Sequence, residues 1–349
     1  MIEDVRAAVF DGKRLVVVDD LQVPEPGPGQ VTVRVLASGI CHSDLNVIDR
    51  TVPVPPPVVL GHEAAGVVDR VGSEVNAWAP GDEVLVSGIT PCGSCHPCRT
   101  GHPTACVEAF GRGASPFRWR GEPVRSYAQV SSFSSVITVE AHRLTWITGI
   151  PATKACVIGC AVTTGYGAVK NAAGVVHGAR VAVLGIGGVG VNALQTARLL
   201  GAIEIVAIDT DPAKEAAARH FGATRFALAD DSGLGTFDAV IECSGAPAAI
   251  DAAIGMTSPG GTTALVGLPP VRHRASFDVG HLMRGRRIVG SLSGDIVPER
   301  DTREIVEHIR AGRLDLDGVV SKVWPLAEIA WAIDALRTGK VIRPVLDLT

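Results

Sequence analysis

The sequence has few aromatic residues, no excess of positive charge and no long uninterrupted hydrophobic run. Phe, Trp and Tyr make up 4% of the 349 residues, which leaves little material for platforms that stack nucleic-acid bases. The formal net charge is -4, so no positive surplus attracts nucleic acid or an anionic membrane. Apolar runs such as 181–186 have the length of a strand rather than of a membrane span. We therefore expect no nucleic-acid partner and no membrane insertion.

The N-terminus also has no feature of a secretory signal. Residues 1–6 include Glu3 and Asp4, and no long apolar stretch follows them. A cytoplasmic protein is the default expectation. Eight cysteines are present, four of them within 92–106, and such clustering in a cytosolic chain favours a metal site over disulfides.

The length and composition indicate a globular protein with more than one core. Hydrophobic residues make up 46% of the chain and charged residues 19%, as in folded domains. A chain of 349 residues is longer than one core usually serves, so two domains are expected.

The first half of the chain predicts short β-strands separated by turns. Residues 31–35 alternate between apolar and polar types, and 66–71 and 82–86 also have strand character. We expect a β-rich, barrel-like domain over residues 1–160, with a cysteine-bearing loop lobe at about 91–107.

The pattern changes after residue 160, where strands alternate with helices. Helices are expected at about 188–200 and from Asp211 to Gly222. The strand candidates are 181–184, 203–208, 237–241, 262–266 and 287–292. This alternation predicts a doubly wound parallel sheet over 161–292 and an α/β fold class. Residues 293–349 are expected to return to the first domain.

A glycine-rich segment follows the first of these strands and opens a helix. It fits G-x-G-x-x-G through Gly185, Gly187, Gly188, Val189 and Gly190. Alone the pattern is weak, but strand before and helix after is the context that dinucleotide binding requires. The helix N-terminus offers free N–H groups to a pyrophosphate. A glycine turn without a ligand is the alternative.

A carboxylate at the end of the second strand bears on the choice of dinucleotide. Asp209 stands 19 residues after Gly190, where it can accept hydrogen bonds from the ribose hydroxyls of NAD and would repel the 2′-phosphate of NADP. Lys214 could add a ribose contact. The alternative for Asp209 is a solvated strand end.

The four clustered cysteines predict a closed metal site. Cys92, Cys95, Cys98 and Cys106 form C-x2-C-x2-C-x7-C, and four thiolates suit a tetrahedral structural zinc. An iron–sulfur cluster is the main rival, and two disulfides are a further alternative.

Cys41, His62 and Cys160 are candidates for a second, open metal site, although their spacing alone does not link them. A lone buried cysteine is usually a small hydrophobe. The order of the motifs links the three residues. The motifs are, in order, Cys41–Asp44, the element 61–66, the four-cysteine lobe, the stretch 160–167 and the glycine fingerprint. This order resembles that of the zinc-dependent medium-chain alcohol dehydrogenases. That family combines a GroES-like catalytic domain with a Rossmann domain.

The resemblance implies two zinc ions per subunit, one catalytic and one structural, and NAD as cofactor. The catalytic zinc would be held by Cys41, His62 and Cys160 and would act as a Lewis acid. Asp44 would hold the free ring nitrogen of His62, and Glu63 would approach the metal from behind. Both carboxylates could instead be ordinary surface groups.

Further roles follow from the resemblance alone. Ser43 matches the hydroxyl that begins a proton relay, whereas Asn46 stands where the family often has the relay histidine. The other implied cofactor contacts are His42 and Arg343 for the pyrophosphate, and Thr164, Val266 and Leu268 for the nicotinamide.

The expected function is the interconversion of a primary alcohol, including allylic or aromatic ones, and its aldehyde by hydride transfer to and from NAD. The family resemblance also predicts a homo-oligomer, a dimer or tetramer built through the edge strand near 287–292. Phe110, Trp119 and Phe133 could line the alcohol channel, but core packing explains them equally well.

Three alternatives remain. One is a glutathione- or mycothiol-dependent formaldehyde dehydrogenase of the same family, and another is a non-catalytic zinc-ribbon interaction module that binds NAD. A zinc-free quinone reductase on the same fold is the third, but such enzymes lack both cysteine sets.

Overall fold

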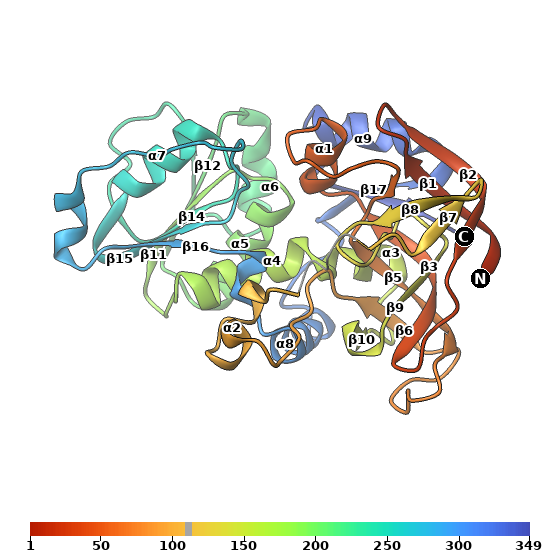
Figure 1. Ribbon diagram of the computed structural model, residues 1–349. Helices are drawn as coiled ribbons and strands as arrows, with labels where there is room; N and C mark the ends of the chain where they lie inside the picture. Colours follow the sequence, from red (N-terminus) through yellow and green to blue (C-terminus); the bar gives the residue numbers. More distant parts are fainter. Residues whose placement is uncertain (109–113) are drawn as a thin grey trace. The chain divides into compact units, whose positions relative to one another are not determined.

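The computed structural model describes residues 1–108 and 114–349 (Figure 1). The chain forms two compact units. The first unit contains 1–160, 298–306 and 320–349, and the second contains 161–297 and 307–319. Residues 293–297 and 307–319, which the sequence assigned to the C-terminal return, therefore lie in the second unit.

The first unit is built around β-strands. Five strands close a barrel in the order β1-β2-β7-β8-β4, and a second sheet runs β10-β6-β5-β3-β18-β17, with β9 paired to β3. The strands are β1 Ile2–Phe10, β2 Leu15–Val23, β3 Gln30–Gly39, β4 Val58–Val59, β5 Glu63–Val71, β6 Glu83–Val86, β7 Phe117–Trp119, β8 Glu122–Ser126, β9 Val136–Glu140, β10 Leu144–Trp146, β17 Val320–Pro325 and β18 Arg343–Asp347. Closure of the barrel leaves these five strands without a free edge.

The core of the first unit explains why these segments become strands. In β3, Val31, Val33 and Val35 are at most 1% exposed, and their side chains enter one hydrophobic cluster. Phe133 is also fully buried in that cluster, which accounts for it as core. Trp119 donates from its indole Nε1 to Asp20 at 2.8 Å, and Phe110 lies outside the described residues.

The second unit is built on a six-stranded sheet in the order β13-β12-β11-β14-β15-β16, with every neighbouring pair parallel. This is the strand order of doubly wound dinucleotide-binding sheets, and it confirms the expected fold class. The strands are β11 Arg180–Leu184, β12 Glu204–Asp209, β13 Arg225–Leu228, β14 Phe237–Glu242, β15 Thr257–Leu265 and β16 Arg287–Gly290.

Helices complete both units, and the entry to α6 carries a clear start signal in the sequence. Asp211 accepts a hydrogen bond from the Ala213 amide at 2.9 Å, and Pro212 follows it, so the chain enters α6 through a single 3-10 turn. The helices are α1 His42–Ile48, α2 His96–Arg99, α3 Ala152–Ala155, α4 Ala161–Gly167, α5 Gly188–Leu199, α6 Glu215–His220, α7 Pro247–Gly255, α8 Pro298–Arg310 and α9 Ile329–Arg337. Among the described residues, no helix has the length and apolar character needed to cross a bilayer.

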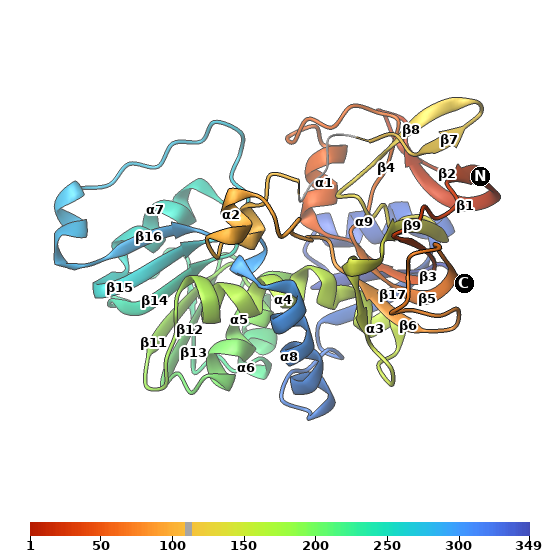
Figure 2. The ribbon, with the colours of Figure 1, turned by 60° about the horizontal axis from the view of Figure 1, so that its bottom comes forward.

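The segment between β15 and β16 loops out beyond the sheet of the second unit (Figure 2). It carries apolar side chains in water: Val271 is 62% exposed, Val279 69% and Met283 80%. The strand that follows it, β16, is an edge of the sheet.

Candidate metal centre and dinucleotide site

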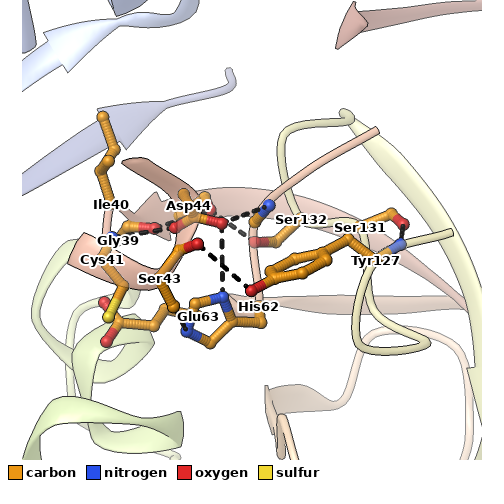
Figure 3. Close-up of polar contacts among 12 residues, drawn as sticks. Gly39, Ile40, Cys41, Ser43, Asp44, His62, Glu63, Tyr127, Ser131 and Ser132 are labelled. Atoms are coloured by element: carbon orange, nitrogen blue, oxygen red, sulfur yellow. Dashed lines mark hydrogen bonds and ion pairs between the residues drawn. The ribbon is translucent and has the colours of Figure 1, made fainter. Parts of the chain in front are cut away.

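Asp44 holds two loops of the first unit together. It lies in the first turn of α1, and its Oδ2 accepts from the amide of Cys41, the residue before the helix, at 2.9 Å. Its Oδ1 accepts from the amide of Gly61 at 3.0 Å. Figure 3 shows Asp44 and the dashed contacts that its carboxylate makes. The carboxylate is fully buried, so the two charge-assisted hydrogen bonds fix the loops on either side of it.

The ring of His62 lies against the same carboxylate. Its Nδ1 is 3.4 Å from Oδ1 of Asp44, and its Nε2 is 3.3 Å from Oγ of Ser43. Tyr127 packs edge-on against the ring at 5.7 Å between centroids. Gly61 permits this turn, since its φ is +88° and a Cβ there would lie 2.5 Å from Phe133. The orientation of the imidazole is thus set from several sides (Figure 3).

Four potential ligands converge beside this histidine. The ligand atoms of Cys41, His62, Glu63 and Cys160 all lie within 4.8 Å of one another. They come from the residue before α1, the residue before β5, the first residue of β5 and the residue that follows a 3-10 turn. The fold therefore brings together three segments that are far apart in the sequence.

The ionisable groups of the cluster perturb one another's pKa values. The hydrogen bond between the two thiols lowers the pKa of Cys41 well below its usual value and raises that of Cys160 well above it. Burial opposes the charged form of His62, yet Asp44 and then Cys41 raise the pKa of the imidazole. Metal ligation needs deprotonated thiols and a neutral imidazole, so a bound cation would release the protons that these groups carry.

Glu63 and Arg343 form a buried pair at the edge of the cluster. Oε1 of Glu63 is 3.7 Å from Nη1 of Arg343, which also donates to the carbonyl of Ile40 at 2.9 Å. Burial raises the pKa of Glu63 to about 7. Gly39 leaves room for the carboxylate, because a Cβ there would lie 1.8 Å from Oε2.

This donor set fits a single zinc ion. Two thiolates and an imidazole are the ligands zinc prefers, and at about 2.0–2.3 Å from the metal they would stand roughly 3.5–3.8 Å apart. The observed spread of at most 4.8 Å requires only small side-chain adjustments to reach that arrangement.

The second cysteine set forms a separate cluster. The sulfur atoms of Cys92, Cys95, Cys98 and Cys106 lie within 4.8 Å of one another. Backbone amides already point at two of them, from Cys95 to Cys92 at 3.3 Å and from Cys92 to Cys106 at 3.2 Å. Such N–H···S bonds stabilise thiolates, and the hydrogen bond from Ser94 helps lower the pKa of Cys92 to about 6.

The geometry disfavours the disulfide alternative for this lobe. All eight cysteines are free thiols, and Sγ of Cys95 is 3.4 Å from Sγ of Cys98, compared with about 2.0 Å in a disulfide. Four sulfur atoms around one point suit a closed tetrahedral zinc site.

The glycine loop of the second unit connects β11 to α5. Gly185 has φ +88°, and a Cβ there would lie 2.8 Å from Cβ of Ser244. A Cβ on Gly190 would lie 2.0 Å from the carbonyl oxygen of Gly185, whereas one on Gly187 would meet nothing within 4 Å. The first and last glycines thus allow tight packing, and Gly187 leaves open space where a pyrophosphate could approach.

A cavity of about 650 Å³ adjoins this loop. Asp209 lines it and is held rigidly, because Oδ2 accepts from the amide of Ile186 at 2.7 Å and Oδ1 from the amide of Asp211 at 3.1 Å. Lys214, in the 3-10 turn Pro212–Lys214, is not among the lining residues.

The remaining predicted cofactor contacts are divided between the two units. Thr164 is 7% exposed in α4, and Leu268 is 55% exposed. The amide of Val266 donates to the carbonyl of Glu242 at 2.9 Å. His42 opens α1 in the first unit, as Arg343 opens β18. Their roles at the nicotinamide and the pyrophosphate stay predictions.

Tyr127 is a site residue that sequence reasoning missed. Its hydroxyl donates to the carbonyl of Ser43 at 3.4 Å, beside the ring of His62. Burial raises its pKa, so it remains a neutral donor. The irregular loop after it, with positive φ at Ala128 and Gln129, gives no periodic signal that could have placed it.

Each of the two units contains a segment that matches a known protein family. Residues 27–149 match the alcohol dehydrogenase GroES-like domain family, and residues 188–311 match the zinc-binding dehydrogenase family. The fold and the two cysteine clusters thus define an oxidoreductase of the zinc-binding dehydrogenase class.

Solved structures extend the match over the whole chain. A zinc-binding-domain alcohol dehydrogenase from Burkholderia ambifaria is 34% identical, with a TM-score of 0.93 and 99% of both chains covered. Benzyl alcohol dehydrogenase from Acinetobacter calcoaceticus is 30% identical, with a TM-score of 0.92 and complete coverage of both chains. A zinc-binding dehydrogenase from Sinorhizobium meliloti bound to NADP is 25% identical, with a TM-score of 0.82 and 99% of both chains covered. The chain belongs to the family of zinc-dependent medium-chain alcohol dehydrogenases.

Proposed function

We propose that the protein is an NAD-dependent zinc alcohol dehydrogenase that interconverts a primary alcohol and its aldehyde, with allylic and aromatic alcohols among the candidate substrates. The convergence of Cys41, His62, Glu63 and Cys160 within 4.8 Å carries this proposal. The 30% identity to a benzyl alcohol dehydrogenase supports an aromatic substrate.

Cys41, His62 and Cys160 would hold the catalytic zinc, with Glu63 close behind it, and Cys92, Cys95, Cys98 and Cys106 the structural one. When bound, the catalytic zinc would supply a Lewis acid that favours loss of the alcohol proton.

The protein's own groups would position the reacting alcohol and carry its proton. Ser43, with Oγ 3.3 Å from Nε2 of His62, is placed to accept that proton. The hydrogen bond from Tyr127 to the Ser43 carbonyl steadies the residue. Asn46 cannot titrate, so the proton would pass from Ser43 to water or to His42 instead of to a histidine at position 46.

The choice of NAD is supported by the charge of the second unit's cavity. Asp209 lines it, and the described lining residues include no Lys, Arg or His. A 2′-phosphate would therefore meet the negative charge of Asp209 with no cation in the cavity wall. Gly185, Gly187 and Gly190 and the N-terminus of α5 would receive the pyrophosphate.

A homo-oligomer, dimer or tetramer, is part of the proposal. The edge strand β16 follows a segment with exposed Val279 and Met283, and apolar side chains beside an unpaired strand favour pairing with another chain. A reducing, cytoplasmic environment is consistent with eight free thiols.

A panel of aliphatic, allylic and aromatic alcohols, assayed with NAD and with NADP at the nicotinamide absorbance, tests the function. We expect turnover of primary alcohols with NAD, and zinc content of two per subunit. Oxidation of formaldehyde only when glutathione or mycothiol is added would favour the thiol-dependent alternative. Tight NADH binding without turnover, and with one zinc per subunit, would favour the interaction module.

A further inference from the structure

The cavity beside the glycine loop holds a second carboxylate besides Asp209. Among the described residues, the two charged ones that line the cavity are Asp209 and Asp231, and the other lining residues are neutral and mostly Ala, Gly, Leu or Ile. The wall is thus largely apolar, as suits an adenine ring, with negative charge from two separate segments.

The chain places Asp231 at the same edge of the sheet as Asp209. Strands β12 and β13 are parallel neighbours in which Asp209 pairs with Leu228. The amide of Ala229 then donates to the carbonyl of Asp209 at 3.0 Å. Three residues beyond the strand pair, Asp231 is therefore at the carboxyl edge of the sheet next to Asp209.

A tight turn fixes the position of Asp231. Its amide donates to the carbonyl of Leu228 at 3.0 Å, and its Oδ2 accepts from the amide of Leu228 at 2.9 Å. The side chain is thus tied to the end of β13, rather than free to swing away from the cavity.

We infer that Asp231 is a second determinant of cofactor selectivity, which acts with Asp209 to reject a 2′-phosphate on the adenosine ribose. This inference rests on the proposed binding of NAD in this cavity. A 2′-phosphate carries close to two negative charges, so each carboxylate repels it, and the described residues of the cavity wall include no cation to offset them. NAD, with a neutral 2′-hydroxyl, meets no such repulsion.

The consequence is that neutralising Asp209 alone leaves substantial discrimination. With Asp231 in place, the variant Asp209→Asn still presents a negative charge to NADP. Removal of both charges is needed to abolish the repulsion, and the two effects on the NADPH/NADH affinity ratio multiply when the charges act independently.

The test measures dissociation constants of NADH and NADPH for the full-length, zinc-loaded enzyme by fluorescence titration. Asp231→Asn keeps an oxygen that can accept from the Leu228 amide. The matched control is Asp230→Asn, since Asp230 is the neighbour of Asp231, is exposed as Asp231 is, and is not a lining residue. Adenosine 2′,5′-bisphosphate and 5′-AMP serve as probes that do not depend on the metal centre.

We expect Asp231→Asn to tighten NADPH binding about three- to tenfold while NADH binding changes less than about twofold. The double variant with Asp209→Asn should gain more than either single variant, and added salt should shrink every gain. If the NADPH/NADH affinity ratio of Asp231→Asn equals that of Asp230→Asn, the role of Asp231 is overturned, while the proposed binding of NAD still stands. Absence of NADH binding to the unmodified enzyme would overturn the proposed cofactor and this inference together.

Discussion

Oδ1 of Asp44 lies 3.4 Å from Nδ1 of His62, while the same carboxylate accepts hydrogen bonds from the amides of Cys41 and Gly61. One buried side chain thus orients the proposed zinc ligand His62. It also holds the backbone at Cys41, a second proposed ligand, and at Gly61, the residue before His62. This arrangement ties the order of the site to a single charge that does not itself need to touch the metal.

Replacement of that charge tests its positioning role. We expect Asp44→Asn to retain the fold, because an amide oxygen still accepts one hydrogen bond, and to weaken zinc affinity about 10- to 100-fold. Competition with a chelator measures this change, and the pH profile of kcat should shift with it. Asp49→Asn is the control, because Asp49 pairs with Arg337 at the surface; equal zinc affinity in the two variants would refute the role.

The proposed zinc ligands can be separated from the structural cluster by stoichiometry. We expect Cys160→Ser to reduce zinc from two ions per subunit to one, and alcohol oxidation to fall by about 10³-fold or more because Lewis-acid assistance is lost. The thermal midpoint should change little. Zinc analysis by mass spectrometry, with Cys243→Ser as a control outside both clusters, checks this; two zinc ions retained in Cys160→Ser would argue against the assignment.

In the four-cysteine lobe, loss of a ligand should affect stability instead of the proposed chemistry. The described part of this loop contributes only a small apolar cluster around Ile89 and Cys106, so bound metal would hold it together. Cys98→Ser should lose one zinc, lower the thermal midpoint by about 4 °C or more, and expose residues 92–106 to proteolysis. An unchanged midpoint with normal resistance to protease would mean that the lobe is ordered without metal.

The second unit contains an ion pair whose effect depends on pH. Burial opposes the charged form of Asp315, but the hydrogen bond from His220 at 2.7 Å, with backbone amides, lowers the pKa of Asp315 below 3.8. A lowered pKa in the folded state adds stability that is complete above pH 3.8 and is lost as the pH falls through the folded value.

Thermal midpoints of Asp315→Asn and the unmodified protein should therefore differ fully at pH 5 and above, and by less at pH 3. Asp230→Asn, an exposed carboxylate of the same unit, should show little difference at either pH. A gap that is as large at pH 3 as at pH 5 would rule out the charge of Asp315 as the cause.

Much of the fold follows from local sequence patterns. The alternation in β3 and the strand, glycine turn and helix of β11 and α5 are each encoded within a few neighbouring residues, so the barrel-like unit and the parallel sheet could be predicted. β13 could not, because it has only four residues and an exposed Arg225 at its start.

The two proposed metal sites also differ in how far they could be predicted from local sequence. The four-cysteine lobe is compact in the sequence, whereas Cys41, His62 and Cys160 are brought together only by long-range strand pairing and were linked through family resemblance. Tyr127 and Asp231 lie on irregular turns, where no periodicity reports which way a side chain points. Their surroundings emerge only from the folded chain.

The central claim is that one zinc ion is held by Cys41, His62 and Cys160. A crystal of the protein, measured on both sides of the zinc absorption edge, locates each ion directly. We expect two anomalous peaks per subunit, one among Cys92, Cys95, Cys98 and Cys106 and one within about 2.3 Å of the two sulfur atoms and the imidazole nitrogen of the proposed catalytic set. An enzyme that oxidises alcohol with NAD but shows no anomalous peak among Cys41, His62 and Cys160 would contradict the account.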